Sequence, residues 1–429
     1  MGHPDSYPRL VFADETGSIY DHPFLRLAGR SGRTVFPLSS QDLIPLPEGS
    51  ELFVLPGRLP VGWDGKTDRP VILDKNPFQR RGKAQAVAAF VSPAHTQTAL
   101  AAWERARDGL SPLPLFAYTA VGWWQGRFWA AAFRSDPDPR QDFRRFDLEE
   151  VRARTLKALR KGRGNRLIQH LGKCSLTYGC PAARNYFHGR FEAPLPTSPF
   201  CNARCLGCIS LQGEGGPPAP QDRIGFVPTP EEIAGVAVPH LARVKQAIVS
   251  FGQGCEGEPL LQGETIGKAI RLIRAATNRG TINLNTNASL PRVAERLVEA
   301  GLESVRISMN SVREQYYTAY YRPKGYGYSD VLESWRIFKQ AGLFVSLNLF
   351  VTPGFTDEED ELERLSECIE SQGLDLIQLR NHTIDPDWYL EEIGHKSSGR
   401  TLGIRGMVAR LKKRFPHLAF GYFNPPVKG

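Results

Sequence analysis

The chain has 429 residues, a length that predicts more than one domain. Hydrophobic residues make up 41% of the sequence and charged residues 23%, which excludes a disordered or fibrous protein. No apolar run is long enough for a membrane-spanning helix, so we expect a cytoplasmic protein without membrane partners. The net charge of +9 favours anionic partners weakly.

The first 147 residues predict an irregular, β-rich N-terminal domain, because their apolar runs are short and often interrupted by Pro and Gly. Gln125-Gly126 lies between two such runs and predicts a hairpin turn. Residues 95–107 predict the one helix of this region. We assign docking of a substrate or partner to this domain as its expected role.

Residues 148–193 predict a basic helix followed by a linker that contains cysteines. The helix is expected over residues 149–161, with Val151, Leu156 and Leu159 on its apolar side. Its many Lys and Arg residues favour a solvated helix between two domains. The alternative is a face that binds RNA or an acidic peptide, but no aromatic residues lie among the charges.

From residue 194 to 429, short β-rich runs alternate with helical patterns. The expected strands are residues 195–200, 247–251, 281–286, 304–309, 344–351 and 375–380. Helices are expected to begin near residues 231, 265, 292, 330 and 358, and a last helix covers residues 404–415. Thr229 to Glu232 and Thr356 to Glu359 both fit a capping box. These repeats predict an α/β fold, namely a partial (β/α)6 TIM-like barrel.

Three cysteines follow the first of these expected strands. Cys201, Cys205 and Cys208 have the spacing C-x3-C-x2-C. Thiolates this close together select zinc, copper(I) or an iron–sulfur cluster. A structural zinc site needs a fourth ligand, which this loop lacks, whereas a cubane cluster held by three cysteines keeps one iron open.

This motif resembles the radical S-adenosylmethionine (SAM) superfamily, whose core is a six-unit partial barrel. The resemblance covers about residues 194–425 and implies a [4Fe–4S] cluster on the three cysteines. It also implies that the open iron binds SAM, that one electron cleaves SAM to a 5′-deoxyadenosyl radical, and that this radical abstracts hydrogen from a substrate. The electron donor is expected to resemble flavodoxin or ferredoxin. Arg204, inside the motif, is expected to keep the surroundings of the cluster positive.

A second motif lies in the sequence SFGQGCEGEPLL at residues 250–261. Its glycines mimic a dinucleotide-binding fingerprint, but no acidic residue ends the next strand, and Pro259 follows at once. Gly257-Glu258-Pro259 instead looks like the superfamily's Gly-Glu-Pro motif, whose backbone binds the amino group of SAM. With the polar residues at later strand ends, the resemblance implies these SAM-binding residues: Gly254, Gly257, Glu258, Pro259, Asn285, Asn287, Ser308, Asn310, Pro353, Gln378 and Arg380.

The remaining cysteines allow several interpretations. Cys174, Cys180 and Cys255 are candidates for an auxiliary iron–sulfur cluster, since some members of the superfamily have one; the alternative is buried, inert thiols. Cys255 alone is a speculative hydrogen or electron donor near the substrate. Cys368 is expected in a helix core. We assign no catalytic residue beyond the cluster ligands.

Other segments leave the substrate open. Residues 313–328 contain six tyrosines, which predict either a substrate pocket or a packed helix, and His382, Asp385 and Asp387 predict substrate contacts or simple turn chemistry. The expected protein is an oxidoreductase or transferase. Its substrate is not identified: it is a protein or peptide, which makes the enzyme an activase or maturase, or else a small metabolite or RNA. A remote alternative is a nucleic-acid-binding protein with structural zinc on Cys174, Cys180, Cys205 and Cys208.

Overall fold

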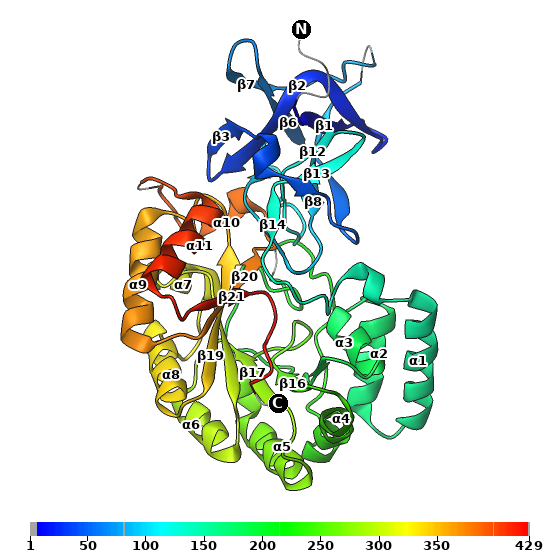
Figure 1. Cartoon of the computed structure of the whole chain (residues 1–429), viewed down its shortest axis with the longest axis vertical. Helices are drawn as coiled ribbons and strands as arrows, with labels where there is room; N and C mark the ends of the chain where they lie inside the picture. Colours follow the sequence, from blue (N-terminus) through cyan, green and yellow to red (C-terminus); the bar gives the residue numbers. More distant parts are fainter. Residues whose placement is uncertain (1–6, 80–81, 214, 398, 428–429) are drawn as a thin grey trace. The chain divides into compact units, whose positions relative to one another are not determined.

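The computed structural model describes residues 7–79, 82–213, 215–397 and 399–427. The chain forms two compact units (Figure 1). The sheet unit combines residues 1–137 with 350–364 and 379–416, and the barrel unit combines residues 138–349, 365–378 and 417–429. Each unit is therefore built from separated stretches of chain, and the boundaries expected at residues 147 and 193 stay a prediction.

The sheet unit contains a 12-stranded sheet in which all pairs are antiparallel. A separate antiparallel pair consists of β9 (His95–Gln97) and β14 (Ala132–Arg134). The strands of the large sheet are β1 (Arg9–Ala13), β2 (Ile19–Ser31), β3 (Thr34–Pro37), β4 (Ile44–Pro45), β5 (Glu51–Leu55), β6 (Arg58–Asp64), β7 (Arg69–Ile72), β8 (Gln85–Phe90), β10 (Leu100–Ala101), β11 (Trp103–Arg105), β12 (Val121–Trp124) and β13 (Arg127–Ala130). The β-rich region expected at the N-terminus is confirmed, and the structure shows that its sheet is antiparallel.

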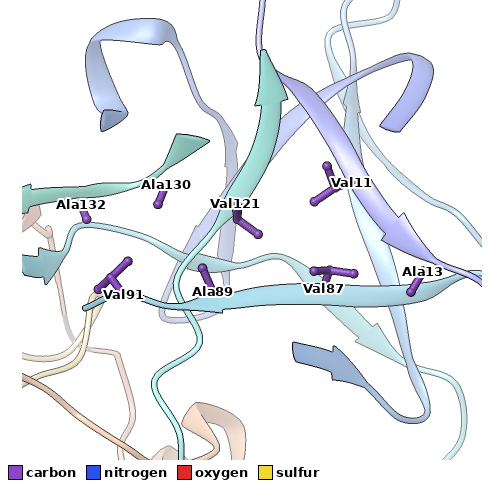
Figure 2. Packing of buried hydrophobic residues seen from close by; sticks show 8 residues of the cluster. All are labelled: Val11, Ala13, Val87, Ala89, Val91, Val121, Ala130 and Ala132. Carbon is purple, nitrogen blue, oxygen red and sulfur yellow. The ribbon is translucent and has the colours of Figure 1, made fainter. Parts of the chain in front are cut away.

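Small and β-branched side chains form part of the core of this unit. The eight residues of one cluster are drawn in Figure 2: Val11, Ala13, Val87, Ala89, Val91, Val121, Ala130 and Ala132. Within β1 and β8 they are two residues apart, because alternate side chains of a strand point to the same face. All eight are at most 5% exposed, so this face is a packed interior.

The helix expected over residues 95–107 is wrong. The segment instead forms β9, β10 and β11, which pair with β14, β2 and β6 respectively. Its alanines favour a helix locally, but pairing with strands far away in the sequence overrides this weak preference. The hairpin at Gln125-Gly126 is confirmed, and both residues have a positive φ, as a tight two-residue turn requires.

The fold class expected for the second half of the chain is confirmed. Seven strands form one sheet in sequence order, and the pairs within the barrel unit are parallel. The strands are β15 (Glu192–Pro194), β16 (Ile248–Phe251), β17 (Thr281–Thr286), β18 (Ser304–Met309), β19 (Phe344–Val351), β20 (Leu376–Asn381) and β21 (Ala419–Gly421). The seventh strand, β21, follows the six that the sequence predicts.

The first expected strand is misplaced. It covers residues 192–194 rather than 195–200, and residues 195–200 are irregular. This segment satisfies part of its backbone through a side chain, since Glu256 accepts hydrogen bonds from the amides of Thr197 and Ser198 at 2.7 and 2.9 Å. A short apolar run in the sequence does not by itself distinguish a strand from an irregular segment of this kind.

Helices α4, α5, α6 and α8 follow one another along the outside of the parallel sheet (Figure 1). Thr229 and Glu232 form the expected capping box of α4. The second expected box is wrong, because α9 begins at Glu359 and the Thr356 hydroxyl donates to the Phe350 carbonyl instead. The helices are α1 (Leu148–Lys161), α2 (Arg166–Leu176), α3 (Pro181–Phe187), α4 (Pro230–Arg243), α5 (Gly263–Ala276), α6 (Pro291–Ala300), α7 (Glu314–Tyr321), α8 (Tyr328–Gln340), α9 (Glu359–Gln372), α10 (Pro386–Glu392) and α11 (Gly403–Arg414).

The basic helix predicted before the barrel is confirmed as α1, but its apolar side differs in part from the expected one. Val151 and Thr155 are buried, whereas Leu156 is 36% exposed. Among the described residues, no helix combines the length and the apolar character needed to span a membrane.

Candidate functional site

The three cysteines of the motif lie on one loop after β15. Cys201, Cys205 and Cys208 are each partly exposed, and the Cys208 amide donates to the Cys205 carbonyl at 3.3 Å. Burial raises the pKa of Cys201 to about 11 and that of Cys205 well above its usual range. The free thiols of Cys201 and Cys205 are therefore protonated at neutral pH, and metal ions that bind them displace the protons.

Helix α7 fixes the backbone of this loop. The amides of Arg204 and Leu206 donate to the carbonyl oxygens of Tyr321 and Tyr320, at 2.8 and 3.1 Å. Four tyrosines of the segment are buried, and Tyr317 stacks on Tyr321 with ring centroids 4.5 Å apart. The packed-helix interpretation of the tyrosine-rich segment is confirmed for α7, whose last carbonyl groups bind the cysteine loop.

A different arginine from the predicted one contacts the cysteines. Arg204 is exposed, and its backbone amide rather than its charge is engaged. Arg223 donates from Nη2 to the Cys208 sulfur at 3.4 Å and from Nε to the Ser210 hydroxyl at 3.1 Å. The sequence gives no warning of this contact, because Arg223 follows the motif by 15 residues in an irregular segment.

The Gly-Glu-Pro loop after β16 packs directly against the segment before Cys201. The amides of Gly257 and Glu258 donate to the carbonyl oxygens of Ser198 and Phe200 at 2.7 and 2.8 Å. A Cβ atom on residue 257 would lie 1.9 Å from the Phe200 carbonyl oxygen, so this position needs glycine. An ammonium group donates hydrogen bonds, so one that binds at this loop is held by backbone carbonyl oxygens and not by these amides.

Two buried glutamates in this loop hold its neighbours. The Glu258 carboxylate accepts from the amides of Asn287 and Leu260, at 2.8 and 3.0 Å, and from the Thr286 hydroxyl. Glu256 accepts from Gln253 at 2.7 Å in addition to Thr197 and Ser198. Burial raises the pKa of both carboxyl groups to about 7, although these hydrogen bonds oppose the shift.

The polar residues at the next strand ends are also buried and paired. Asn285 donates to the Gly252 carbonyl at 2.8 Å, and Asn287 donates to the Asn202 side chain in the cysteine loop at 3.0 Å. Asn348 donates to Ser308 at 3.4 Å, and Asn310 donates to the Tyr316 carbonyl at 3.1 Å. The structure therefore brings Asn287 to the cysteine loop, whereas Asn310 contacts the start of α7.

Gln378 belongs to a polar layer inside the barrel unit, where it donates to the Asn424 side chain at 2.9 Å. Pro353 and Arg380 belong to the sheet unit. There, the Pro353 carbonyl accepts from the Gly32 amide at 2.9 Å. A Cβ on Gly354 would lie 1.8 Å from the Gly32 nitrogen. Close packing against Gly32 thus explains the Pro-Gly pair by itself.

His382, Asp385 and Asp387 have structural partners within the sheet unit. The Thr352 hydroxyl lies 3.0 Å from Nδ1 of His382. Asp385 caps α10 and forms a buried ion pair with Arg58 at 3.1 Å. Asp387 pairs with Arg30 at 2.7 Å. These contacts support turn and packing chemistry for the three residues.

The other cysteines separate into two groups. Cys174 and Cys255 are buried together, with His170 beside both sulfurs, and Cys180 packs against them. The contacts with Cys255 and His170 lower the pKa of Cys174 to about 5, whereas the contact with Cys174 raises the pKa of Cys255. Cys368 is partly buried in α9. His170 was not expected here from the sequence, although His170 and Cys174 have the i, i+4 spacing of one helix face.

The four cysteines of the remote zinc alternative do not come together. Among the described residues, the grouped metal-binding side chains are His170, Cys174 and Cys255, without Cys205 or Cys208. Three thiols in one half-exposed loop, with an arginine on one sulfur, instead fit an iron–sulfur cluster that keeps one coordination position open.

Comparison with known families decides the assignment. Residues 195–366 match the sequence profile of the Radical SAM superfamily, and this range contains the cysteine loop and the Gly-Glu-Pro loop. This part of the chain is a radical SAM domain. Proteins of this superfamily are enzymes that cleave SAM at an iron–sulfur cluster.

The chain is similar to curated GTP 3′,8-cyclases. It is 28% identical over 180 residues to the GTP 3′,8-cyclase of Streptomyces coelicolor, which covers 40% of this chain and 48% of that protein. It is 30% identical over 218 residues to the GTP 3′,8-cyclase of Mycobacterium ulcerans, which covers 50% and 55%. The chain thus spans about half the length of the curated relatives it matches.

Solved structures of radical SAM proteins are more distant. HydG, a maturase of the [FeFe]-hydrogenase, has a TM-score of 0.40 and 15% identity, and covers 66% of this chain and 67% of that one. SuiB of Streptococcus suis, solved with S-adenosylmethionine, has a TM-score of 0.38 and 14% identity, and covers 65% and 67%.

Proposed function

We propose that this chain binds a [4Fe–4S] cluster on Cys201, Cys205 and Cys208, cleaves SAM reductively and abstracts a hydrogen atom from a peptide or protein substrate. The observation that carries the proposal is the loop of three thiols, which is tied to the Gly-Glu-Pro loop by the amides of Gly257 and Glu258. When bound, the cluster supplies the electron and the open iron position for SAM. An external one-electron donor of the flavodoxin or ferredoxin type is needed to reduce it.

The chain's own residues position these groups. The Glu258 carboxylate holds Asn287, and Asn287 in turn holds Asn202 of the cysteine loop at 3.0 Å. The carbonyl oxygens of the Gly-Glu-Pro loop then receive the SAM ammonium group. Because Glu258 and Asn287 are buried and hydrogen-bonded within the chain, we expect this framework to be in place before SAM binds. The other SAM contacts that we propose are those that the resemblance implies.

A cavity beside the cysteine loop offers room for a large substrate. Its volume is about 770 Å³, and its lining includes Ser210, Gln212 and Arg223, which contact Cys208 or its carbonyl. RNA would require clustered positive charge and several stacking aromatics. Lys173 in the lining is paired with Asp222. Among the described residues that line the cavity, only Tyr178 has a Phe, Tyr or Trp side chain. A peptide or protein segment therefore fits this wall better than RNA.

The first test measures SAM cleavage. The full chain is reconstituted anaerobically with iron and sulfide, reduced with dithionite and assayed for 5′-deoxyadenosine. We expect the product from the unsubstituted chain and from Cys368→Ala, and none from Cys201→Ala, Cys205→Ala or Cys208→Ala. Product formation by all three loop variants would refute the proposed ligands.

The second test concerns the substrate. A cell extract that stimulates 5′-deoxyadenosine formation is digested with protease or with ribonuclease. GTP is assayed separately, because the matched relatives are GTP 3′,8-cyclases. Loss of stimulation with protease alone supports a peptide or protein substrate. Loss with ribonuclease, stimulation that survives both digestions, or stimulation by GTP would contradict it.

A further inference from the structure

A second group of metal-binding side chains lies in the barrel unit, apart from the cysteine motif. Nε2 of His170 is 3.4 Å from the Cys255 sulfur and 3.5 Å from the Cys174 sulfur. All three atoms lie within 4.8 Å of one another. Each residue contributes one donor atom that faces the same small space.

Helix geometry and one long-range contact produce this arrangement. His170 and Cys174 are one turn apart on α2, so that their side chains lie on the same face. Cys255 comes from the loop after β16, and its carbonyl accepts from the Ile224 amide at 2.8 Å. Cys174 is 3% exposed and Cys255 is 7% exposed. The donors are therefore held in place by secondary structure and packing.

The separations of the donors match a single ion. Zinc binds imidazole nitrogen at about 2.0–2.1 Å and thiolate sulfur at about 2.3 Å in a tetrahedron. Ligand atoms at such vertices are about 3.5–3.8 Å apart, which follows from those bond lengths. In a cubane cluster, by contrast, each ligand binds a different iron, and the ligand atoms are much farther apart. We propose that His170, Cys174 and Cys255 bind one zinc ion.

Cys180 is not part of this donor set. Cys180 packs against Cys174 and Cys255, and its amide donates to the Cys174 carbonyl at 3.0 Å. Its sulfur, however, is outside the group of donor atoms that lie within 4.8 Å of one another. The ion therefore has three protein ligands. His170 also lines the cavity of about 770 Å³, so the fourth position faces a space that admits water or a substrate atom.

The alternative is that these residues are inert packing groups. Thiols are weak hydrogen-bond partners, so two sulfurs satisfy an imidazole nitrogen poorly. An ion that binds both thiolates leaves no net charge in this buried place, which removes the cost of burying the thiolates alone. The ion also joins α2 to the loop in which Gly257 and Glu258 follow Cys255 by two and three residues. Zinc here positions the Gly-Glu-Pro loop.

The test removes the other metal-binding loop first. The full chain with Cys201, Cys205 and Cys208 all changed to Ala is purified, and its zinc, iron and sulfide are measured. We expect about one zinc per chain and no iron. We expect zinc to be lost in this background with His170→Gln or Cys174→Ser, and retained with Cys180→Ser or Cys368→Ser.

Three results would overturn the proposal: no zinc in the background variant, iron with matching sulfide in place of zinc, or loss of zinc with Cys180→Ser. Cobalt(II) gives a second readout that does not need a ligand to be changed. Its thiolate charge-transfer absorption, measured on the background variant, is expected to report two thiolate ligands. Because zinc content is measured in the absence of the cluster, this result is independent of the proposed SAM cleavage.

Discussion

The Glu258 carboxylate accepts a hydrogen bond from the Asn287 amide at 2.8 Å and thereby joins the loops that follow β16 and β17. Glu258 is 4% exposed and Asn287 is 6% exposed. The same carboxylate holds Leu260 and Thr286, so two motifs that are 28 residues apart in the sequence form one rigid piece. The segment that leads into the cysteine loop is bound to these loops, because the carbonyls of Ser198 and Phe200 accept from the amides of Gly257 and Glu258.

Gly257→Ala is expected to disturb this junction. The new methyl group would meet the Phe200 carbonyl oxygen at 1.9 Å, so the loop before Cys201 must move. Overpacking of this kind costs about 1–3 kcal/mol in the free energy of unfolding. We expect at least a tenfold loss of 5′-deoxyadenosine formation, because the displaced segment leads directly into Cys201; a tenfold loss corresponds to about 1.4 kcal/mol in the activation free energy.

Gly225→Ala is the matched control, because no atom lies within 4 Å of the position that its new methyl group would take and its φ is ordinary. It should keep both stability and product formation. Equal losses from both glycine variants would show that the contact with Phe200 has no special role.

Arg223→Gln is expected to make the reduction potential of the bound cluster more negative. Arg223 donates to the Cys208 sulfur at 3.4 Å, and a positive hydrogen-bond donor on a ligand sulfur stabilises the reduced cluster. A potentiometric titration followed by electron paramagnetic resonance measures the shift. Arg204→Gln, which changes an exposed side chain, should leave the potential unchanged. A larger shift for Arg204→Gln would mean that the sequence-based expectation about Arg204 holds after all.

Arg58→Met is expected to destabilise the sheet unit by about 3–5 kcal/mol, because it leaves a buried carboxylate without its cation. The side chains of Arg58 and Asp385 are 4% and 1% exposed, and they are 3.1 Å apart. Urea unfolding measures the difference. Arg105→Met is the control, since the Arg105–Glu391 pair is 32% and 47% exposed and contributes below about 1 kcal/mol. Similar effects from the two substitutions would contradict the role of burial.

His382 is expected to make stability depend on pH. Burial lowers its pKa to about 3, whereas the pKa is 6.5 in the unfolded chain. Below pH 6.5 the unfolded chain therefore binds a proton that the folded chain does not bind. The contribution of His382 to stability is complete above pH 6.5 and decreases by about 1.4 kcal/mol per pH unit as the pH falls toward 3.

The measurement compares urea unfolding at pH 7 and pH 5 for the unsubstituted chain and His382→Asn. The other titrating groups are common to both chains, so the difference isolates His382. We expect the unsubstituted chain to lose more stability on acidification. An identical pH dependence of the two chains would show that His382 is protonated in the folded protein.

The sequence predicts the barrel far better than the region before it. Strands 281–286, 304–309 and 344–351 agree with the structure at both ends, because each is a short, mostly buried run with β-branched or apolar residues between a helix and a polar turn. Residues 95–107 fail because their strand partners, such as β2 and β6, are distant in the sequence. Local preference carries no information about such partners.

The same distinction explains the candidate site. The cysteine motif is visible because its three residues are close together in the sequence, and the structure places them on one loop. Arg223 is not visible, since it meets Cys208 through the fold, and His170 meets Cys255 in the same way although Cys174 is one helical turn away. His170, for example, lies 85 positions from Cys255 in the sequence. The metal ligands and SAM contacts that the sequence predicts remain predictions until the cleavage assay is done.

The division of the sheet unit among three stretches of chain has a consequence during synthesis. Gln97 donates to the carbonyl of Val351 at 3.2 Å, and its amide donates to Asn381 at 2.8 Å, so strand β9 is completed by residues made about 250–280 positions later. A ribosome that adds roughly 5–20 residues per second needs about 15–60 s to cover that distance. During this interval the emerging segments that include β9 lack these later contacts. We expect them to engage chaperones, and we expect a chain that stops before residue 379 to be degraded even though its first 137 residues are intact.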